Sequence, residues 1–276
     1  MKKILVPTDL SENANHALRY AMKLGKQTGF DEIFLLNATT VPVNPGDTLL
    51  PVTKLLLEDS QKQMAEFLTE VKSWEDAEAF DIHIQSSVDD AVSAIRDYAN
   101  KIQPDLIVMG TKGTSGIGEF LFGTVSAAVL EQSDVPVLVI PGDVPFHKIT
   151  SIAFAADLKN IENMDSLRIL KNLCIALQAR LHIVHVASDS SLNIEESKEK
   201  SDLLSYFHGL QLQFHSITSE SIYTGIEIFM QDFDLDAIAV LSRRRNFFEK
   251  IFHTSMSKRI AYRTFLPLLS MKELSA

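Results

Sequence analysis

Residues 105–126, DLIVMGTKGTSGIGEFLFGTVS, constrain the fold more than any other stretch of this chain. The stretch opens with the short apolar run 106–109, which has the β-branched content of a buried strand. Gly110 and Gly113 then indicate a loop, and Gly123 comes before a run of residues that is compatible with a helix. The stretch therefore predicts a strand, a loop with the spacing G-x2-G-x9-G-T, and a helix.

Glycine at these loop positions is expected to serve two purposes. It lets the backbone adopt a positive φ, and it lets a ligand approach N–H groups that a Cβ atom would shield. The expected helix start, residues 123–126, presents unpaired N–H groups and the positive end of the helix dipole, which favour an anion such as phosphate. Thr124 and Ser126 add hydroxyl groups. The alternative is a flexible surface loop that is capped by a hydroxyl.

The N-terminal residues predict another strand of the same sheet. Residues 2–8 form a largely apolar run with Pro7 near its end, where a missing N–H is tolerated. Asp9 then falls at the carboxyl edge of the strand, where open α/β sheets bind ligands, so its carboxylate is placed to accept from an adenine amino group or a ribose hydroxyl. The alternative is an aspartate that bonds the following turn. Ser11 is a candidate N-cap for the next helix.

Strands and helices alternate through the rest of the first half. The expected strands are residues 32–38, 79–85 and 135–140, and the expected helices include residues 56–71 and 91–98. A polar loop that contains proline, residues 39–51, precedes the first of these helices and could lie over a pocket. The alternation predicts a parallel sheet whose right-handed crossovers cover both faces with helices.

The second half of the chain repeats the order of the first. Residues 149–160, ITSIAFAADLKN, match the register of KILVPTDLSEN and place Asp157 against Asp9, at an offset of 148. Further along, residues 237–241 echo residues 105–109, and residues 265–271 echo residues 135–141. The sequence therefore predicts a tandem duplication.

The predicted fold class is α/β, with two tandem domains of the same architecture. The domains are expected over residues 1–142 and 147–276, joined by the linker PGDVPF. Each is expected to be an open, parallel, five-stranded, doubly wound sheet of the Rossmann-like type, because βαβ units repeat in both halves.

The second copy lacks the glycine loop. Where the first copy has MGTKGTSGIGEFLFGTVS, the second has LSRRRNFFEKIFHTSMS, and the chain has no glycine after Gly225. Without glycines its backbone is not expected to bind phosphate in the same way. The replacement carries Arg243, Arg244 and Arg245, which are either a solvated basic face or a docking site for an acidic partner.

Composition and charge limit the classes of function. The net charge of −10 lies in the first half, since residues 1–146 contain 11 Lys and Arg against 21 Asp and Glu, and the remaining residues contain 15 of each. Such an acidic half is expected to repel nucleic acid. We expect no membrane span, because no apolar run is long enough, and no signal peptide. The single cysteine, Cys174, lies among apolar residues and indicates a cytoplasmic core residue.

Sequence motifs for catalysis and metal binding are weak. His182 and His185 lie three apart on an expected strand and so point to opposite faces, which prevents them from sharing an ion and favours a structural role for His185. The chain contains no HExxH, CxxC or GxSxG motif, and no pyrophosphatase-type SGGxDS loop follows the first strand.

The glycine pattern resembles the nucleotide-binding signature of the universal stress protein family, G-x2-G-x9-G-(S/T). The opening KKILVPTDLSENANHAL also resembles the first strand and helix of that family. The resemblance covers the whole chain as two copies, of which the second is degenerate, and it implies adenine nucleotide alpha hydrolase-like domains. The site residues that it implies are Pro7, Thr8, Asp9, Ala38, Met109, Gly110, Lys112, Gly113, Gly123, Thr124, Val125 and Ser126.

The resemblance also implies how a ligand would lie. Adenine is expected near Pro7, Asp9 and Ala38. The ribose is expected beside Met109 and the first two loop glycines, and the phosphates on residues 123–126. The implied ligand is ATP, or AMP or ADP, in the first domain. Mg²⁺ or Mn²⁺ is expected to arrive with the phosphates, because no carboxylate cluster builds a metal site.

The implied function is that of a cytoplasmic stress-response protein that acts as a nucleotide-dependent signalling module. Family members dimerise through their last strand, so the two domains are expected to pair through residues 135–140 and 265–270, and a homodimer is a further expectation. One alternative is an enzyme that slowly hydrolyses ATP or phosphorylates itself, for which no general base is evident. In that case Lys112 would neutralise phosphate charge, unless it is simply exposed. Another is an interaction module that needs no nucleotide.

Overall fold

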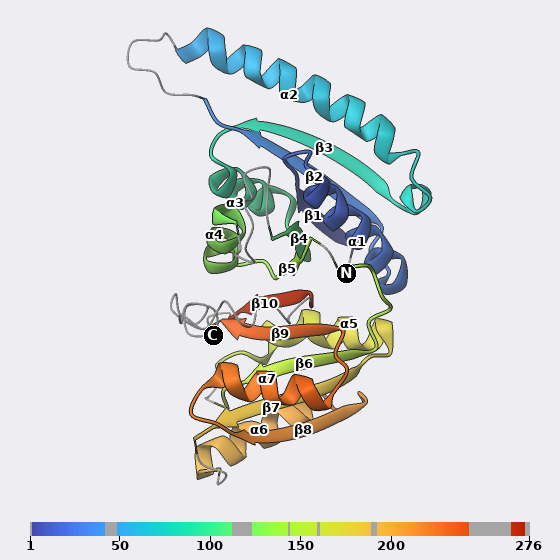
Figure 1. Ribbon diagram of the computed structural model, residues 1–276. Coiled ribbons are helices and arrows are strands. Elements are labelled where there is room, and N and C mark those ends of the chain that lie inside the picture. The colour runs from blue at the N-terminus through green and yellow to red at the C-terminus, as the bar shows by residue number, and fades with distance from the viewer. Residues whose placement is uncertain are drawn as a thin grey trace. The chain divides into compact units, whose positions relative to one another are not determined.

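The computed structural model describes residues 2–41, 49–111, 123–142, 144–158, 161–188, 192–242 and 266–273. Contacts divide the chain into two compact units, Met1–Gly142 (unit 1) and Asp143–Ala276 (unit 2). In each unit strands alternate with helices (Figure 1).

Unit 1 is a parallel α/β sheet with the strand order β3-β2-β1-β4-β5. Its strands are β1 (Lys3–Pro7), β2 (Glu32–Thr39), β3 (Asp81–Val88), β4 (Leu106–Gly110) and β5 (Val137–Ile140). Its helices are α1 (Glu12–Thr28), α2 (Leu49–Val71), the 3-10 turn η1 (Ala77–Ala79), α3 (Ala91–Ile102) and α4 (Thr124–Gln132). Right-handed crossovers in this order place α1 and α2 on one face of the sheet and α3 and α4 on the other.

Unit 2 has the equivalent strand order, β10-β9-β6-β7-β8, again with parallel pairing. Its strands are β6 (Ser151–Ala156), β7 (Arg180–Ala187), β8 (Leu212–Thr218), β9 (Ala237–Ser242) and β10 (Leu268–Lys272). Its helices are the 3-10 turn η2 (Met164–Leu167), α5 (Arg168–Leu177), α6 (Ile194–Tyr206) and α7 (Ile222–Asp232). The predicted fold class, a parallel five-stranded α/β sheet in each half, is confirmed.

Local sequence signals account for β1 and α1. Ile4, Leu5 and Val6 are fully buried at the centre of the sheet, as a strand covered on both faces requires. The Ser11 side chain accepts a hydrogen bond from the Ala14 N–H at 3.2 Å, so the predicted N-cap is confirmed. The helix ends at Gly29, whose φ of 78° is the left-handed conformation that glycine adopts without strain.

Several element boundaries differ from the sequence prediction, and three of the differences lie near the ends of α2, β5 and β10. Helix α2 begins at Leu49, within the stretch that was expected to be a loop. Strand β5 begins at Val137 rather than at residue 135, because the Ser133 hydroxyl accepts from the Val135 N–H and donates to the Val135 carbonyl in a turn. Strand β10 spans Leu268–Lys272 instead of residues 265–270.

An aspartate before the fourth strand anchors the first strand in each unit. Asp105 Oδ2 accepts hydrogen bonds from the Lys2 and Lys3 N–H groups, at 2.7 and 3.2 Å. Asp236 Oδ2 accepts from the N–H groups of residues 150 and 151, at 2.7 and 3.0 Å. The offset between the two aspartates is 131 (236 − 105), so the duplication is visible in side-chain chemistry as well as in strand order.

The pairing registers correct one part of the predicted alignment. Leu106 pairs with Ile4, and Ala237 pairs with Ile152 in the same way, so the fourth strands align at an offset of 131 (237 − 106). The sequence comparison had set Ala237 against residue 105. The corrected alignment places Leu241 at the position of Gly110.

Candidate functional site

Unit 1 contains a cavity of about 270 Å³ at the carboxyl ends of β1, β2 and β4. The first turns of α1, α3 and α4 close it from the sides, as expected for a ligand site in an open α/β sheet. The described residues that line it are Pro7, Thr8, Asp9, Ala14, Leu36, Ala38, Ala91, Ile95, Met109, Gly110, Gly123, Thr124, Val125 and Ser126.

Ten of the twelve predicted site residues line this cavity, and the other two, Lys112 and Gly113, lie outside the described residues. The sequence did not single out four lining residues, which are Ala14, Leu36, Ala91 and Ile95. All four are apolar. Their signal was present but weak: Leu36 lies on the expected second strand, and the other three are apolar residues in the first turns of helices beside the expected strand edge.

The loop after β1 is held by two short side-chain hydrogen bonds. The Thr8 hydroxyl accepts from the Leu10 N–H at 3.0 Å, and Leu10 has a φ of 62°, which is rare for a residue with a Cβ. Asp9 Oδ1 accepts from the Ser11 N–H at 3.1 Å. The turn role considered for Asp9 is therefore present, although the same residue also lines the cavity.

The start of α4 forms one wall of the cavity. Gly123 is the N-cap and has no side chain to cap the first turn, while its own N–H donates to the Thr111 carbonyl. The next three N–H groups, of Thr124, Val125 and Ser126, belong to the first helical turn, where the helix itself supplies no acceptor. This helix start can therefore hold an anion.

Ser126 contributes to the site differently from the prediction. Its hydroxyl donates to the Gly110 carbonyl at 2.8 Å, and the residue is only 4% exposed. The hydroxyl thus ties α4 to the end of β4, and the group that Ser126 presents to a ligand is its backbone N–H.

One purpose predicted for the loop glycines is absent at two of them, since neither Gly110 nor Gly123 has a positive φ. At Gly110 the reason is space. A Cβ atom there would lie 2.9 Å from Asn13 Cγ and 3.1 Å from the Asn13 carbonyl oxygen. Glycine at the end of β4 lets the first turn of α1 approach the sheet.

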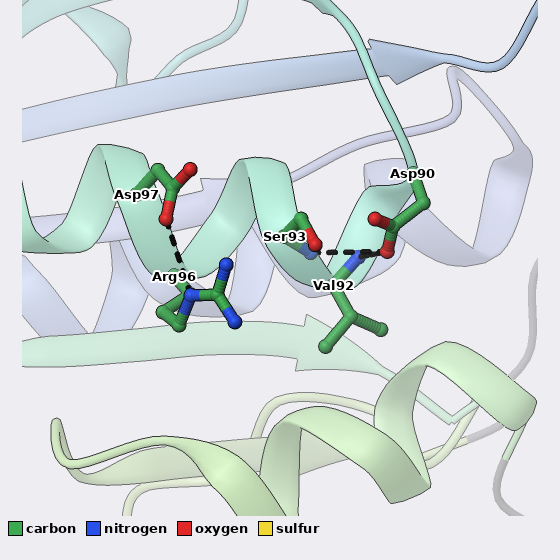
Figure 2. Close-up of polar contacts among 5 residues, drawn as sticks. All are labelled: Asp90, Val92, Ser93, Arg96 and Asp97. Atoms are coloured by element: carbon green, nitrogen blue, oxygen red, sulfur yellow. Dashed lines mark hydrogen bonds and ion pairs between the residues drawn. The ribbon is translucent and has the colours of Figure 1, made fainter.

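The start of α3 is already capped by a carboxylate (Figure 2). Asp90 Oδ1 accepts from the Val92 and Ser93 N–H groups, both at 3.1 Å. Hydrogen bonding from the Ser93 side chain, and then from the backbone, lowers the pKa of Asp90 below its usual range. Two residues of this helix, Ala91 and Ile95, line the cavity, so α3 offers it an apolar wall while α4 offers the anion site.

The described residues of unit 2 line a small cavity at the equivalent edge. Its volume is about 10 Å³, and it is lined by Phe154, Ala155, Ala156, Asp157, Leu158, Ile161, Leu203 and Leu241. The carboxylate of Glu199, on α6, reaches this edge and accepts from the Ile161 N–H at 3.2 Å. The arginines at 243–245 lie outside the described residues.

Two histidines of unit 2 form a pair that the sequence did not reveal. His182 Nδ1 lies 3.0 Å from His215 Nε2, and both rings pack against Phe229 and Phe233. Burial lowers the pKa of both imidazoles, and for His182 the charge of His215 lowers it further. His185 is separate from this pair, since its Nδ1 lies 3.0 Å from the Ala156 carbonyl oxygen.

The described ranges show neither a metal site nor a membrane span. Those ranges contain no cluster of three or more His, Cys, Asp or Glu side chains that could hold a metal ion. Within the same ranges no helix has both the length and the apolar character to cross a membrane. Cys174 is buried, and burial raises the pKa of its thiol to about 12, so it is an unreactive core residue.

These features define an α/β protein with a ligand cavity at the carboxyl edge of one of its two sheets. The universal stress protein family model matches residues 1–141. The chain belongs to this family, and the predicted resemblance is confirmed.

Individual relatives agree with this assignment. Universal stress protein MJ0531 of Methanocaldococcus jannaschii is 31% identical over 140 residues, which cover 50% of this chain and 81% of the relative. Universal stress protein MJ0577 of the same organism is 30% identical over 158 residues, covering 50% and 94%.

A solved structure resembles the whole chain. A universal stress protein from Archaeoglobus fulgidus superposes with a TM-score of 0.74 at 21% identity, covering 99% of this chain and 98% of that protein. At this identity the likeness concerns the fold, and it includes both halves of the chain.

Proposed function

We propose that unit 1 binds an adenine nucleotide, with ATP as the first candidate and ADP and AMP as alternatives. The observation that carries the proposal is the cavity of about 270 Å³ in the half of the chain that the family model matches. Its volume is near the lower end of the roughly 300 to 1,000 Å³ that is typical of small-molecule sites. Ligand binding, rather than turnover, is the activity that this site supports.

The chemistry of the walls suggests an orientation for the nucleotide. The apolar side chains of Ala38, Leu36 and Ile95 suit the faces of a base, and Asp9 offers a carboxylate acceptor to an amino or hydroxyl group. The first turn of α4 offers its N–H groups to phosphate oxygens. The ribose would then lie between these ends, near Met109 and Gly110.

A divalent cation would enter with the phosphates. Asp9 is the single ionisable side chain among the described lining residues, so this wall alone supplies few of the six oxygen ligands that Mg²⁺ prefers. Mg²⁺ or Mn²⁺ bound mainly by phosphate oxygens and water fits that donor set. Lys112 is a candidate to balance the remaining phosphate charge.

Release of bound nucleotide gives the first test. Purified protein is denatured, and the supernatant is analysed for ATP, ADP and AMP. The protein stripped of nucleotide is then titrated with each of them, with and without Mg²⁺. We expect saturable binding, and no inorganic phosphate release at a rate typical of enzymes. Absence of binding under all these conditions would favour the interaction module that needs no nucleotide.

We further propose that the chain acts in the cytoplasm as a nucleotide-dependent regulatory module, with its two units paired through their last strands. The strands β5 and β10 are apolar and stand last in the strand order of their own units, and exposed apolar edges favour pairing. Charged residues at Val137 and Leu268 should therefore cause aggregation, measured by light scattering. A soluble double variant of unchanged stability would contradict the pairing.

A further inference from the structure

A buried polar side chain lies directly behind the cavity of unit 1. Asn37, on β2, is 8% exposed, and its Nδ2 donates to the Thr8 carbonyl at 2.9 Å. Its Oδ1 accepts from the hydroxyl of Ser60, which is 4% exposed and comes from α2, at 2.8 Å. One amide therefore joins β1, β2 and α2 through two hydrogen bonds.

These bonds occur where the backbone pairing of β1 and β2 ends. The last residues in register are Pro7 and Leu36, and the Thr8 N–H still donates to the Leu36 carbonyl at 2.8 Å. Beyond that point the side chain of Asn37 replaces the backbone as the donor to β1. Thr8 and Ala38, on either side of this link, line the cavity.

Unit 2 keeps one half of this arrangement. His185 is the counterpart of Asn37 at the offset of 148 (185 − 37), and its Nδ1 lies 3.0 Å from the carbonyl oxygen of Ala156, the counterpart of Thr8. His185 Nε2 is buried and has no hydrogen-bond partner among the described residues. A side chain thus links the first two strands in both units. The additional link to a helix, from Asn37 to Ser60 on α2, is in unit 1, which has the large cavity.

We propose that Asn37 is a positioning residue for the nucleotide site, and that Ser60 ties its amide to α2. The Thr8 carbonyl fixes the orientation of the amide, because a reversed amide would bring its oxygen against the Thr8 carbonyl oxygen, and the two acceptors would repel each other. The observed orientation leaves Oδ1 to accept from the Ser60 hydroxyl at 2.8 Å and, more weakly, from the Thr39 hydroxyl at 3.4 Å. The wall around Thr8, Asp9 and Ala38 is then formed before the ligand binds. This inference rests on the proposed function of unit 1.

Three substitutions separate the two bonds. Asn37→Asp keeps an acceptor for Ser60 and removes the donor to Thr8. Ser60→Ala keeps that donor and the Thr39 contact, and removes the link from the amide to α2. Asn37→His introduces the side chain that unit 2 uses at the same position. The control is His185→Leu, which removes the corresponding bond from unit 2.

The measurement is ATP affinity at 25 °C, where circular dichroism shows each variant to be fully folded. We expect Asn37→Asp to weaken binding by about tenfold or more, and Ser60→Ala by about threefold to tenfold, as for the loss of one buried hydrogen bond. Asn37→His should remain within about threefold of the unsubstituted protein, and His185→Leu should leave affinity unchanged.

Amide hydrogen exchange at Thr8, without nucleotide, supplies a second readout. The inference predicts faster exchange at Thr8 in Asn37→Asp and Ser60→Ala, and protection close to normal in Asn37→His. Lower thermal stability with unchanged ATP affinity and unchanged Thr8 exchange would overturn the positioning role. If the unsubstituted protein binds no ATP, the proposed function fails, and the exchange data alone then decide whether Asn37 positions this edge.

Discussion

Unit 1 and unit 2 have the same strand order and the same aspartate anchor before the fourth strand, yet their cavities differ in volume, about 270 Å³ against about 10 Å³. Unit 2 therefore has the same fold as unit 1, but its described residues line a much smaller cavity. The central strands of both sheets are buried on both faces, and that burial does not depend on the residues at the carboxyl edge. The burial that stabilises both sheets therefore resides largely in other residues than those that line the cavity of unit 1.

The alignment identifies what closes the edge of unit 2. Gly110 and Asn13, which touch in unit 1, correspond to Leu241 and Ile161 at offsets of 131 and 148. Both apolar residues line the remaining small cavity, and both are less than 9% exposed. A glycine beside a polar residue has been replaced by two packed aliphatic side chains, which stabilise the unit by burial and fill the space.

The largest expected effect comes from transferring the unit 2 residue into unit 1. Gly110→Leu should weaken ATP binding by at least about a hundredfold, or about 2.7 kcal/mol, because its side chain must enter the cavity or displace Asn13. Gly142→Leu is the matched control. A Cβ at Gly142 would also meet Asn13, at 2.8 Å from Oδ1, but Gly142 is not a lining residue. Calorimetric titration measures the ATP affinity of both variants. Equal losses of affinity would show that displacement of Asn13, rather than filling of the cavity, weakens binding.

The reverse change should weaken unit 2 without giving it a function. Leu241→Ala removes a buried side chain, and we expect it to lower the free energy of unfolding by about 2 to 5 kcal/mol. Urea unfolding followed by circular dichroism measures this loss. Binding of a second ATP to this variant would contradict the view that unit 2 lacks the glycine loop that binding requires, and not merely the cavity volume.

Asp9→Asn should weaken ATP binding by about 1 to 2 kcal/mol, as expected for the loss of one charge-assisted hydrogen bond. The control is Asp157→Asn, the same change at the equivalent position of unit 2, and it should have no effect on affinity. Titration under identical salt conditions compares the two. A similar loss from both would mean that the two edges act together.

Acid should weaken unit 2 through the pair of His182 and His215. Burial lowers the folded-state pKa of both below the 6.5 that is usual for histidine, so the folded protein favours the neutral rings. Stability is therefore fully present above about pH 6.5 and declines as the pH falls below it, because the unfolded chain takes up protons first. The protection factors of the α7 amides, which correct for the intrinsic pH dependence of exchange, should fall as the pH is lowered from 7 to 5, and His215→Gln should reduce this fall. Equal pH dependence in both proteins would exclude the pair as its cause.

Local patterns in the sequence predicted much of the fold and of the candidate site. Strand periodicity, the Ser11 cap and the glycine spacing all act within a few residues, and the family resemblance carried by the local motifs implied ten of the lining residues. The missed features depend on contacts between distant segments. Asn37 meets Ser60 across 23 residues, and His182 meets His215 across 33, and both contacts require a sheet register that no local pattern supplies.

The misaligned fourth strand has a similar cause. The offset between the units changes from 148 to 131 after the second strand, because the second copy is shorter there. Both fourth strands are runs of similar apolar residues, so their sequences alone can be aligned at either of two positions one residue apart. The pairing with the first strand of each unit shows that Leu241, rather than Ser242, occupies the position of Gly110.

The number of nucleotides bound per chain distinguishes a site in unit 1 alone from a site in each unit. Native mass spectrometry of the full chain with ATP and Mg²⁺ should show one nucleotide per chain at saturation. Hydrogen exchange of the same sample should show protection at residues 8, 9 and 123–126 and none at residues 154–158. Two nucleotides per chain, or protection at residues 154–158, would contradict the claim that unit 1 alone has kept the site.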